Sequence, residues 1–437
     1  MNRKFQKNSI LATISSLLPL LSLFLIVFAS AMSYRNPYRD VIFGILVMGF
    51  ILLIVSSYLP TSPPNHLMFV FILTLLGFCA NHYLQTPLYV VLAILAYVGM
   101  VFHKRFLFWI IILAVVALQI FGLVHLWQWG TEPIDVFGEL QKGSQFFLHG
   151  ENPYFHKFSA FVFEDPNGKY FIPFHYGPSI IILASFGRIF GDVRVTSLFW
   201  ILVTYGIIIW NSYKNAETHY WKIMILSLAI LPVTIGMIVN GWVDSYMVGC
   251  FALWFILRFK IPVISALFLG LALAGKPTLL PAIVPFFIFI PKLRKNILFS
   301  LVWALVIIVP FALWTGPMAL YNDVIAVHYN FFHIRTDAYS FNGFLYAHHL
   351  PFLPSWLGAV ITLLLLATQL IRSPKTYSQL FLMCAALVMS SYIFSQYSFF
   401  NYHYVVIVLI LLALSNSKSL LVEKEKQIRL RAFWRSL

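Results

Sequence analysis

One segment of the chain gathers acidic, histidine and tyrosine residues of the kinds that accept protons and bind hydroxyl groups. Asp135 and Glu139 lie one helical turn apart, and His175 and Tyr176 follow later in the same segment. Asp135 has apolar residues on both sides. A carboxylate at a water–lipid boundary can act as a general base, because partial desolvation makes it more basic. The competing interpretation is a first-turn acid that the helix dipole stabilises.

The elements that must position these residues are apolar stretches about as long as a bilayer is thick. Of the 437 residues, 61% are hydrophobic and only 10% are charged, whereas about a quarter are charged in a soluble domain. Such stretches recur along almost the whole chain. They predict an all-α polytopic membrane protein with about 14 transmembrane helices, located in the plasma membrane.

The net charge of +15 does not indicate a nucleic-acid surface, because the basic residues lie in short loops between apolar stretches. Most of these loops share one side of the predicted topology with the basic C-terminal tail. We therefore expect both termini in the cytoplasm. The basic clusters are Lys104-Arg105, Arg258/Lys260, Lys292/Arg294/Lys295 and Arg372/Lys375.

Three parts follow from this pattern. Residues 1–105 form an N-terminal accessory set of four helices, residues 106–416 form the core, and residues 417–437 form a basic cytoplasmic tail. The first apolar run, about 10–32, exceeds the ~7–15 residues of a typical signal core, so we expect a retained helix. The run 262–291 is too long for one span, and Gly275-Lys276-Pro277 breaks it. A tight hairpin is predicted there.

The long segments 127–192 and 315–350, and the shorter segment 395–404, all fall on the outer side. In the first segment, Val136, Phe137, Leu140 and Phe147 share one helical face, with Glu139 and Lys142 elsewhere. This pattern predicts an amphipathic helix on the membrane surface, capped by Thr131 and ended by Gly150. The apolar stretch 178–190 is too short to cross a bilayer, which keeps this segment outside.

Several short stretches follow one another in a set order along the chain. They are Asp135, Gly150–Tyr154, Phe174–Pro178, Asn240–Asp244 and Gly270–Thr278, with weaker similarities at Ser340–Gly343 and His403. Their order resembles the GT-C superfamily of membrane glycosyltransferases, and most closely glycosyltransferase family 87. That family includes mannosyltransferases that use polyprenyl-phosphate-mannose. The resemblance covers roughly residues 106–416, while Trp242 stands where the family pattern has a polar residue, and the four extra N-terminal helices also depart from it.

The resemblance implies transfer of a hexosyl residue from a polyprenyl-phosphate-linked donor, with mannose as the leading candidate sugar. The acceptor is a hydroxyl of a lipid-linked or glycan molecule on the extracytoplasmic face. Asp135 is the expected general base, with inversion at the anomeric carbon. A retaining arrangement with Glu139 as the second carboxylate is the alternative. No cofactor other than the donor is expected, and the chain has no Asp-x-Asp pair that would demand a metal ion.

Within this hypothesis, Asp135 and His403 are the expected catalytic residues. A developing negative charge on the leaving phosphate needs cations or hydrogen-bond donors, and Lys276 is the sharpest candidate. The residues expected to contact the substrates are Glu139, Tyr154, His175, Tyr176, Asp244, Lys276, His333, Arg335 and Asn342.

Each of these assignments has a structural alternative. Lys276 can simply reach water at the apex of its hairpin, and Arg335 can be a solvated loop residue. His403 and Tyr176 can anchor the chain at the membrane interface. Asp244 can cap the helix that follows Gly241.

Two other functional classes remain open from the sequence. A transporter or flippase is the first, but such proteins often have internal repeats and paired broken helices near the bilayer midplane. This chain has one broken hairpin and no matching second half. A polysaccharide polymerase or ligase that uses a pyrophosphate-linked glycan is the second.

Overall fold

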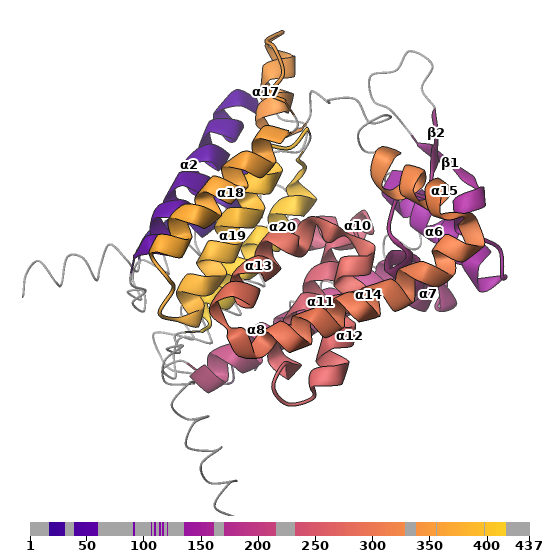
Figure 1. Cartoon of the computed structure of the whole chain (residues 1–437), viewed down its shortest axis with the longest axis horizontal. Coiled ribbons are helices and arrows are strands. Elements are labelled where there is room, and N and C mark those ends of the chain that lie inside the picture. The colour runs from indigo at the N-terminus through magenta and orange to yellow at the C-terminus, as the bar shows by residue number, and fades with distance from the viewer. Residues whose placement is uncertain are drawn as a thin grey trace, which may run out of the picture.

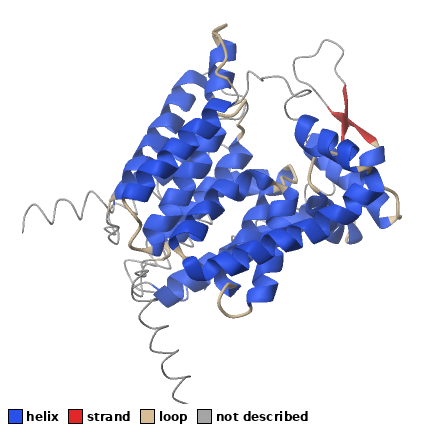
Figure 2. Ribbon diagram, viewed as in Figure 1, coloured by secondary structure: helices blue, strands red, loops and turns tan. Residues whose placement is uncertain are grey.

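The computed structural model describes residues 17–30, 39–59, 135–160, 170–215, 232–327, 338–354, 356–396 and 398–416, with a few isolated positions between 91 and 120. Most of these residues are helical (Figure 2), which confirms the all-α class in outline. The exception is an antiparallel hairpin of β1 (Lys157–Ala160) and β2 (Tyr170–Pro173), in which Lys157 lies opposite Pro173. The sequence analysis does not predict this hairpin.

The helix bounds follow the apolar stretches closely. The principal helices are α2 (Arg39–Tyr58), α6 (Asp135–Leu148), α7 (Pro178–Ile189), α8 (Arg194–Asn215), α10 (Pro232–Val239), α11 (Asp244–Leu257), α12 (Pro262–Gly275), α13 (Leu280–Phe289), α14 (Arg294–Thr315), α15 (Pro317–Tyr321), α17 (Phe341–Ala347), α18 (Trp356–Ile371), α19 (Tyr377–Ile393) and α20 (Phe400–Leu414). A short π-helix, η4 (Asn322–Ala326), follows α15.

These helices form two packed groups (Figure 1). Helices α2, α18 and α20 pack around α19, while α8, α11, α12 and α14 form the second group. Contacts of α11 with α20 and of α13 with α19 join the groups. Nearly every residue of α19 is buried, as expected for a helix that other helices surround on all sides.

Three helices of the described residues are long and apolar enough to cross a bilayer. They are Arg39–Tyr58, Arg194–Asn211 and Pro291–Thr315. The pair Pro262–Gly275 and Pro277–Phe289 also passes this test together, and it bends by 116° at the break. The predicted break at Lys276 is confirmed. The two helices on either side of it are less close to antiparallel than the predicted tight hairpin. The predicted number of about 14 crossings stays a prediction.

Contacts between distant segments fall at two ends of the helices. At one end, the indole Nε1 of Trp254 donates to Asn296 (2.6 Å), whose Nδ2 donates to the carbonyl of Pro262 (2.7 Å). At the other, the N–H of Tyr339 donates to the carbonyl of Ser398 (2.7 Å). The first end holds residues predicted to face the cytoplasm, and the second holds residues predicted to face outside.

The described part of residues 1–105 packs closely on the C-terminal helices. Phe43 of α2 stacks on Phe344 (5.5 Å) and meets Phe341 edge-on (5.3 Å). The hydroxyl of Ser30 lies 3.0 Å from Nδ1 of His403 in α20. Residues 17–30 and 39–59 are therefore an integral part of the bundle, and the other predicted helices of the N-terminal part lie outside the described residues.

Candidate active site

Helix α6 begins at Asp135, and its far end is closed as the sequence predicts. Asp135 is half-buried, and its Oδ1 accepts a hydrogen bond from the N–H of Val136 (2.9 Å). Gly150 has a φ of 79°, and its N–H donates to the carbonyl of Phe147 (3.0 Å). A glycine in this left-handed conformation ends a helix without steric cost. Thr131, the predicted cap, lies outside the described residues.

The apolar face of α6 packs on protein. Phe137 and Leu140 are buried, and Phe147 stacks on Phe311 of α14 (5.6 Å). Gly143 lies so close to the Phe174 ring that an added Cβ would come within 3.0 Å of it. This face of α6 therefore packs on α7, α14 and the segment before α7, and the position of the helix at the membrane surface stays a prediction.

Glu139 is also buried on this face, which corrects the prediction that it lies elsewhere on the helix. Its side chain is fully inaccessible. Its Oε1 accepts a hydrogen bond from the N–H of His175 (2.8 Å), and its Oε2 lies 2.9 Å from Nδ1 of the His175 ring. Burial raises the pKa of Glu139, and the interactions with His175 oppose that rise. A carboxylate held in this way supports His175, and its contact with a substrate stays a prediction.

The three residues His175, Tyr176 and Gly177 are each tied to a different element. The N–H of His175 donates to Glu139 of α6, as described above. The carbonyl of Tyr176 accepts from the hydroxyl of Tyr154 (2.7 Å), and the N–H of Gly177 donates to the carbonyl of Gly275 (3.1 Å). This segment therefore joins α6 to the apex of the broken hairpin, and its backbone is fixed before any substrate binds.

Gly177 is the point of closest approach, and an alanine there is expected to separate the segment from the hairpin. A Cβ at this position would collide with the backbone carbonyls of Ala274 and Gly275. We expect Gly177→Ala to lower the free energy of unfolding by about 1–3 kcal/mol, measured by thermal unfolding in detergent. The matched control is Gly206→Ala in α8, where a Cβ has open space. Equal effects of the two substitutions would contradict the close contact.

A second cluster lies at the hairpin apex. Asp244, at the start of α11, accepts a hydrogen bond from Nζ of Lys276 on Oδ1 (2.7 Å) and one from Nδ2 of Asn401 on Oδ2 (2.7 Å). The Lys276 ammonium also lies 3.9 Å from the centre of the Tyr402 ring. The side chain of Lys276 is 13% exposed and that of Asp244 only 1%. The positive charge of Lys276 and the negative charge of Asp244 therefore pair with each other in a place that water hardly reaches.

Tyr176 links the two clusters electrically. Burial raises the pKa of its hydroxyl well above the ordinary value, and Glu139, Tyr402, Asp135 and Asp244 raise it further, in that order. The acidic groups of both clusters are therefore close enough to act on one phenol. The hydrogen bond from Gly177 to Gly275 joins the segment of His175 and Tyr176 to the hairpin of Lys276, which pairs with Asp244. Glu139 contacts His175, and Asp135 lies one helical turn before Glu139.

Tyr154, another predicted residue, contacts this group of residues through its hydroxyl, which donates to the carbonyl of Tyr176. Asn152 caps the turn around it by accepting the N–H of Tyr154 (3.0 Å), and its Nδ2 donates to Thr315 at the end of α14 (2.9 Å). The ring of Tyr154 meets the ring of Phe174 edge-on, with 5.4 Å between the ring centres. The hydroxyl of Tyr154 holds the Tyr176 carbonyl, so Tyr154 positions the segment instead of offering its hydroxyl to a substrate.

Other predicted residues do not join the cluster through any described contact. Asn342 is buried and holds Leu353, whose N–H donates to its Oδ1 (2.8 Å). His403 is buried, with Nδ1 3.0 Å from Ser30 and Nε2 3.4 Å from Ser398. These contacts give both residues a packing role, and the catalytic role of His403 stays a prediction. His333 and Arg335 lie outside the described residues.

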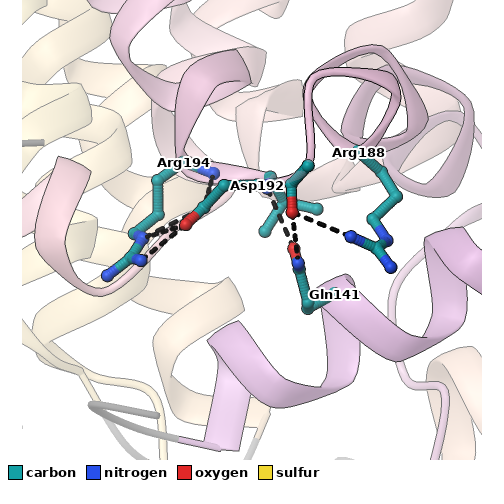
Figure 3. A network of polar contacts seen from close by, with 6 residues as sticks. Gln141, Arg188, Asp192 and Arg194 are labelled. Atoms are coloured by element: carbon teal, nitrogen blue, oxygen red, sulfur yellow. Dashed lines mark hydrogen bonds and ion pairs between the residues drawn. The ribbon is translucent and has the colours of Figure 1, made fainter. Parts of the chain in front are cut away.

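A polar network that sequence reasoning missed holds α6 against the turn between α7 and α8 (Figure 3). Arg194 makes a buried bidentate ion pair with Asp192, and its guanidinium lies 4.5 Å from the centre of the Phe137 ring. Gln141 donates to the carbonyl of Gly191 (2.7 Å) and accepts from the N–H of Val193 (3.0 Å). The sequence signal for this network is the pair Asp192 and Arg194, two residues apart and directly after the apolar stretch 178–190.

Gln141 offers a test of how firmly α6 is held. Gln141→Leu removes two hydrogen bonds to backbone groups of the turn, and we expect it to lower the free energy of unfolding by about 1–3 kcal/mol. Gln145→Leu, one turn further along α6, removes only an exposed contact with Arg188 and should change stability by less than about 0.5 kcal/mol. Thermal unfolding of both variants measures the difference, and equal shifts would refute the role of Gln141.

Asn401 and Tyr402 are the site residues that the sequence analysis missed within a segment it did single out, residues 395–404. Within the described ranges, no three His, Cys, Asp or Glu side chains gather as they would to hold a metal ion. Comparison of the chain with family models, with curated proteins and with solved structures finds no match.

Proposed function

We propose that this protein transfers a hexosyl residue from a polyprenyl-phosphate-linked donor to a hydroxyl of a lipid-linked or glycan acceptor. Mannose is the leading candidate for the transferred sugar. One observation carries the proposal. Segments far apart in the chain, each singled out by the resemblance to glycosyltransferases, meet at one place: Asp135 and Glu139 of α6, His175 and Tyr176, Asp244, and Lys276.

The proposed reaction is a single displacement. The acceptor oxygen attacks the anomeric carbon while the bond from that carbon to the phosphate oxygen breaks. The carboxylate of Asp135 takes the proton of the attacking hydroxyl. Polyprenyl phosphate leaves with the bonding electrons, and the Lys276 ammonium is the candidate group that stabilises its charge. The anomeric configuration is inverted.

The contacts of α14 support an extracytoplasmic position for this site. The helix begins beside the basic residues Lys292, Arg294 and Lys295, which by the positive-inside rule belong to the cytoplasmic side. Its last residue, Thr315, accepts a hydrogen bond from Asn152. The span Pro291–Thr315 is long and apolar enough to cross a bilayer, so Asn152 and the neighbouring Tyr154 belong to the opposite side.

The test is a transfer assay with the full chain in lipid nanodiscs. Polyprenyl-phosphate-mannose with a radiolabelled sugar is supplied, together with membranes as the source of acceptor, and labelled glycolipid or glycan is measured. The control is Lys295→Gln, at the start of α14, which should transfer at the wild-type rate. Absence of transfer together with uptake of the label into sealed vesicles would refute the proposal in favour of transport.

A further inference from the structure

We infer that the Asp323 carboxylate accepts a hydrogen bond from a hydroxyl group of a saccharide substrate, either the donor sugar or the acceptor. Asp323 lies in the π-helix η4, outside the stretches that carry the resemblance to glycosyltransferases. The inference rests on the proposed function, which it deepens by adding a substrate-binding carboxylate. It depends on the position of Asp323 beside Tyr154 and on its hydrogen-bonding state.

Asp323 differs from the other acidic residues that the structure describes, because each of those accepts a hydrogen bond or lies in an ion pair. Asp323 has no such partner in the described part of the chain. Its oxygens are therefore available to a ligand or to water. The other acidic residues are Asp40 with His348, Glu151 with His156, Asp192 with Arg194, Asp244 with Lys276, and Asp135 and Glu139 with backbone N–H groups.

Asp323 lies on the face of its helix that packs on the protein. Leu320 and Val327, three residues before it and four residues after it, are buried, and Val324 packs against the core. Residues three and four apart share a helical face, whereas Ile325 on another face is exposed. Asp323 itself is half-buried, and burial raises the pKa of its carboxyl group. The carboxylate is thus partly withdrawn from water and still accessible.

This face belongs to the same end of the molecule as the candidate site. Thr315, the last residue of α14, bonds with Asn152 in the turn that carries Tyr154. Helix α15 follows and leads directly into η4. Burial raises the pKa of the Tyr154 hydroxyl well above its ordinary value, and the charges of Glu139 and then Asp323 raise it further. The carboxylate of Asp323 is therefore near enough to Tyr154 to contribute to the site.

The local backbone and the charge indicate what binds there. The π-helix η4 has five residues, and π-helical turns are rare and occur frequently at functional sites. A carboxylate accepts hydrogen bonds from hydroxyl groups and repels a phosphate. The hydroxyl-bearing part of a substrate therefore suits Asp323, while the phosphate of the donor suits the ammonium of Lys276.

The key variant is Asp323→Ala, which removes the acceptor atoms. We expect the KM of the substrate that Asp323 contacts to rise about tenfold, the ratio that one hydrogen bond supplies, with a smaller change in kcat. Asp323→Asn keeps one acceptor oxygen and should recover part of the loss. The matched control is Asp40→Ala, which removes an exposed carboxylate from α2 and should leave both KM values unchanged.

Binding without turnover identifies the substrate. The full chain in nanodiscs is titrated with polyprenyl-phosphate-mannose and, separately, with polyprenyl phosphate. If Asp323 contacts the donor sugar, Asp323→Ala should weaken binding of the first ligand and leave the second unchanged. If it contacts the acceptor, both affinities should stay as in the wild type, and only the amount of acceptor membrane needed for half-maximal transfer should rise.

Thermal unfolding separates binding from folding. Because Asp323 has no described partner, Asp323→Ala should unfold at the wild-type temperature or above it at neutral pH. A lower unfolding temperature together with weaker binding of polyprenyl phosphate would show that Asp323 only supports the fold, and it overturns the inference.

The remaining outcomes keep the two proposals apart. Transfer by the wild type, with both KM values unchanged in folded Asp323→Ala, overturns the inference alone. A wild-type protein that neither binds polyprenyl-phosphate-mannose nor transfers its sugar refutes the proposed function, and the inference with it.

Discussion

Replacing Asp135 by asparagine is expected to lower the rate of sugar transfer by about 10²–10⁴-fold, the range that a positioned general base contributes. The amide cannot take the proton of the attacking hydroxyl. It can still accept the N–H of Val136 that Asp135 now receives at 2.9 Å, so the first turn of α6 should form as before. The measurement is single-turnover transfer of labelled sugar by purified protein at saturating donor.

The matched control for this substitution is Gln145→Leu, which changes an exposed contact on the same helix. Thermal unfolding of Asp135→Asn in detergent should match the wild type within about 0.5 kcal/mol. Two results would contradict the assignment. Transfer that persists in a folded Asp135→Asn protein excludes Asp135 as the base. A loss of stability large enough to account for the whole loss of transfer shows that Asp135 only caps its helix.

The second large effect is expected at the ion pair between Lys276 and Asp244. Lys276→Met leaves the Asp244 carboxylate buried with Asn401 as its remaining described partner. Removing one member of a buried pair costs about 3–5 kcal/mol, because the other charge stays out of water. We expect a loss of this size in the free energy of unfolding of Lys276→Met, and a similar loss for Asp244→Leu.

The double variant separates stability from chemistry. Lys276→Met with Asp244→Leu removes both charges, and replacing a buried pair by apolar residues is often neutral for stability. It should therefore be more stable than either single variant in a double-mutant cycle. Sugar transfer should stay absent, because no cation remains at this position for the leaving phosphate. Full recovery of transfer would show that the pair only holds the helices together.

Where the structure describes the long apolar stretches, helices lie in them, because the lengths of these helices come from local signals. The short helices α15 and α17, in the segment 315–350, are not predicted. The break at Lys276 comes from a local signal as well, because Gly275 and Pro277 flank a charged residue there, whereas Pro285 and Pro310 lie inside helices. The β1–β2 hairpin was missed. Its strands read Lys-Phe-Ser-Ala and Tyr-Phe-Ile-Pro, which are too short and too weakly alternating for a strand prediction.

The site was predicted in its membership but not in its contacts. Asp244 and Lys276 were named separately, yet nothing local indicates that they pair across 32 residues. Helical spacing places Glu139 off the apolar face, and the partner that offsets the cost of burying it, His175, lies 36 residues along the chain. Asn401 resembles an ordinary polar residue at a helix start, and its bond to Asp244 spans 157 residues.

The length of α14 has a consequence for where the chemistry takes place. Its 22 residues extend over about 33 Å at 1.5 Å per residue, close to the ~30 Å thickness of a hydrocarbon core. One end of the helix carries the cationic anchor Arg294, and the other is bonded to Asn152 in the segment that carries Tyr154. In a thinner bilayer the helix tilts or the bilayer thickens locally, and a tilt would change the depth of the proposed substrate site relative to the headgroups.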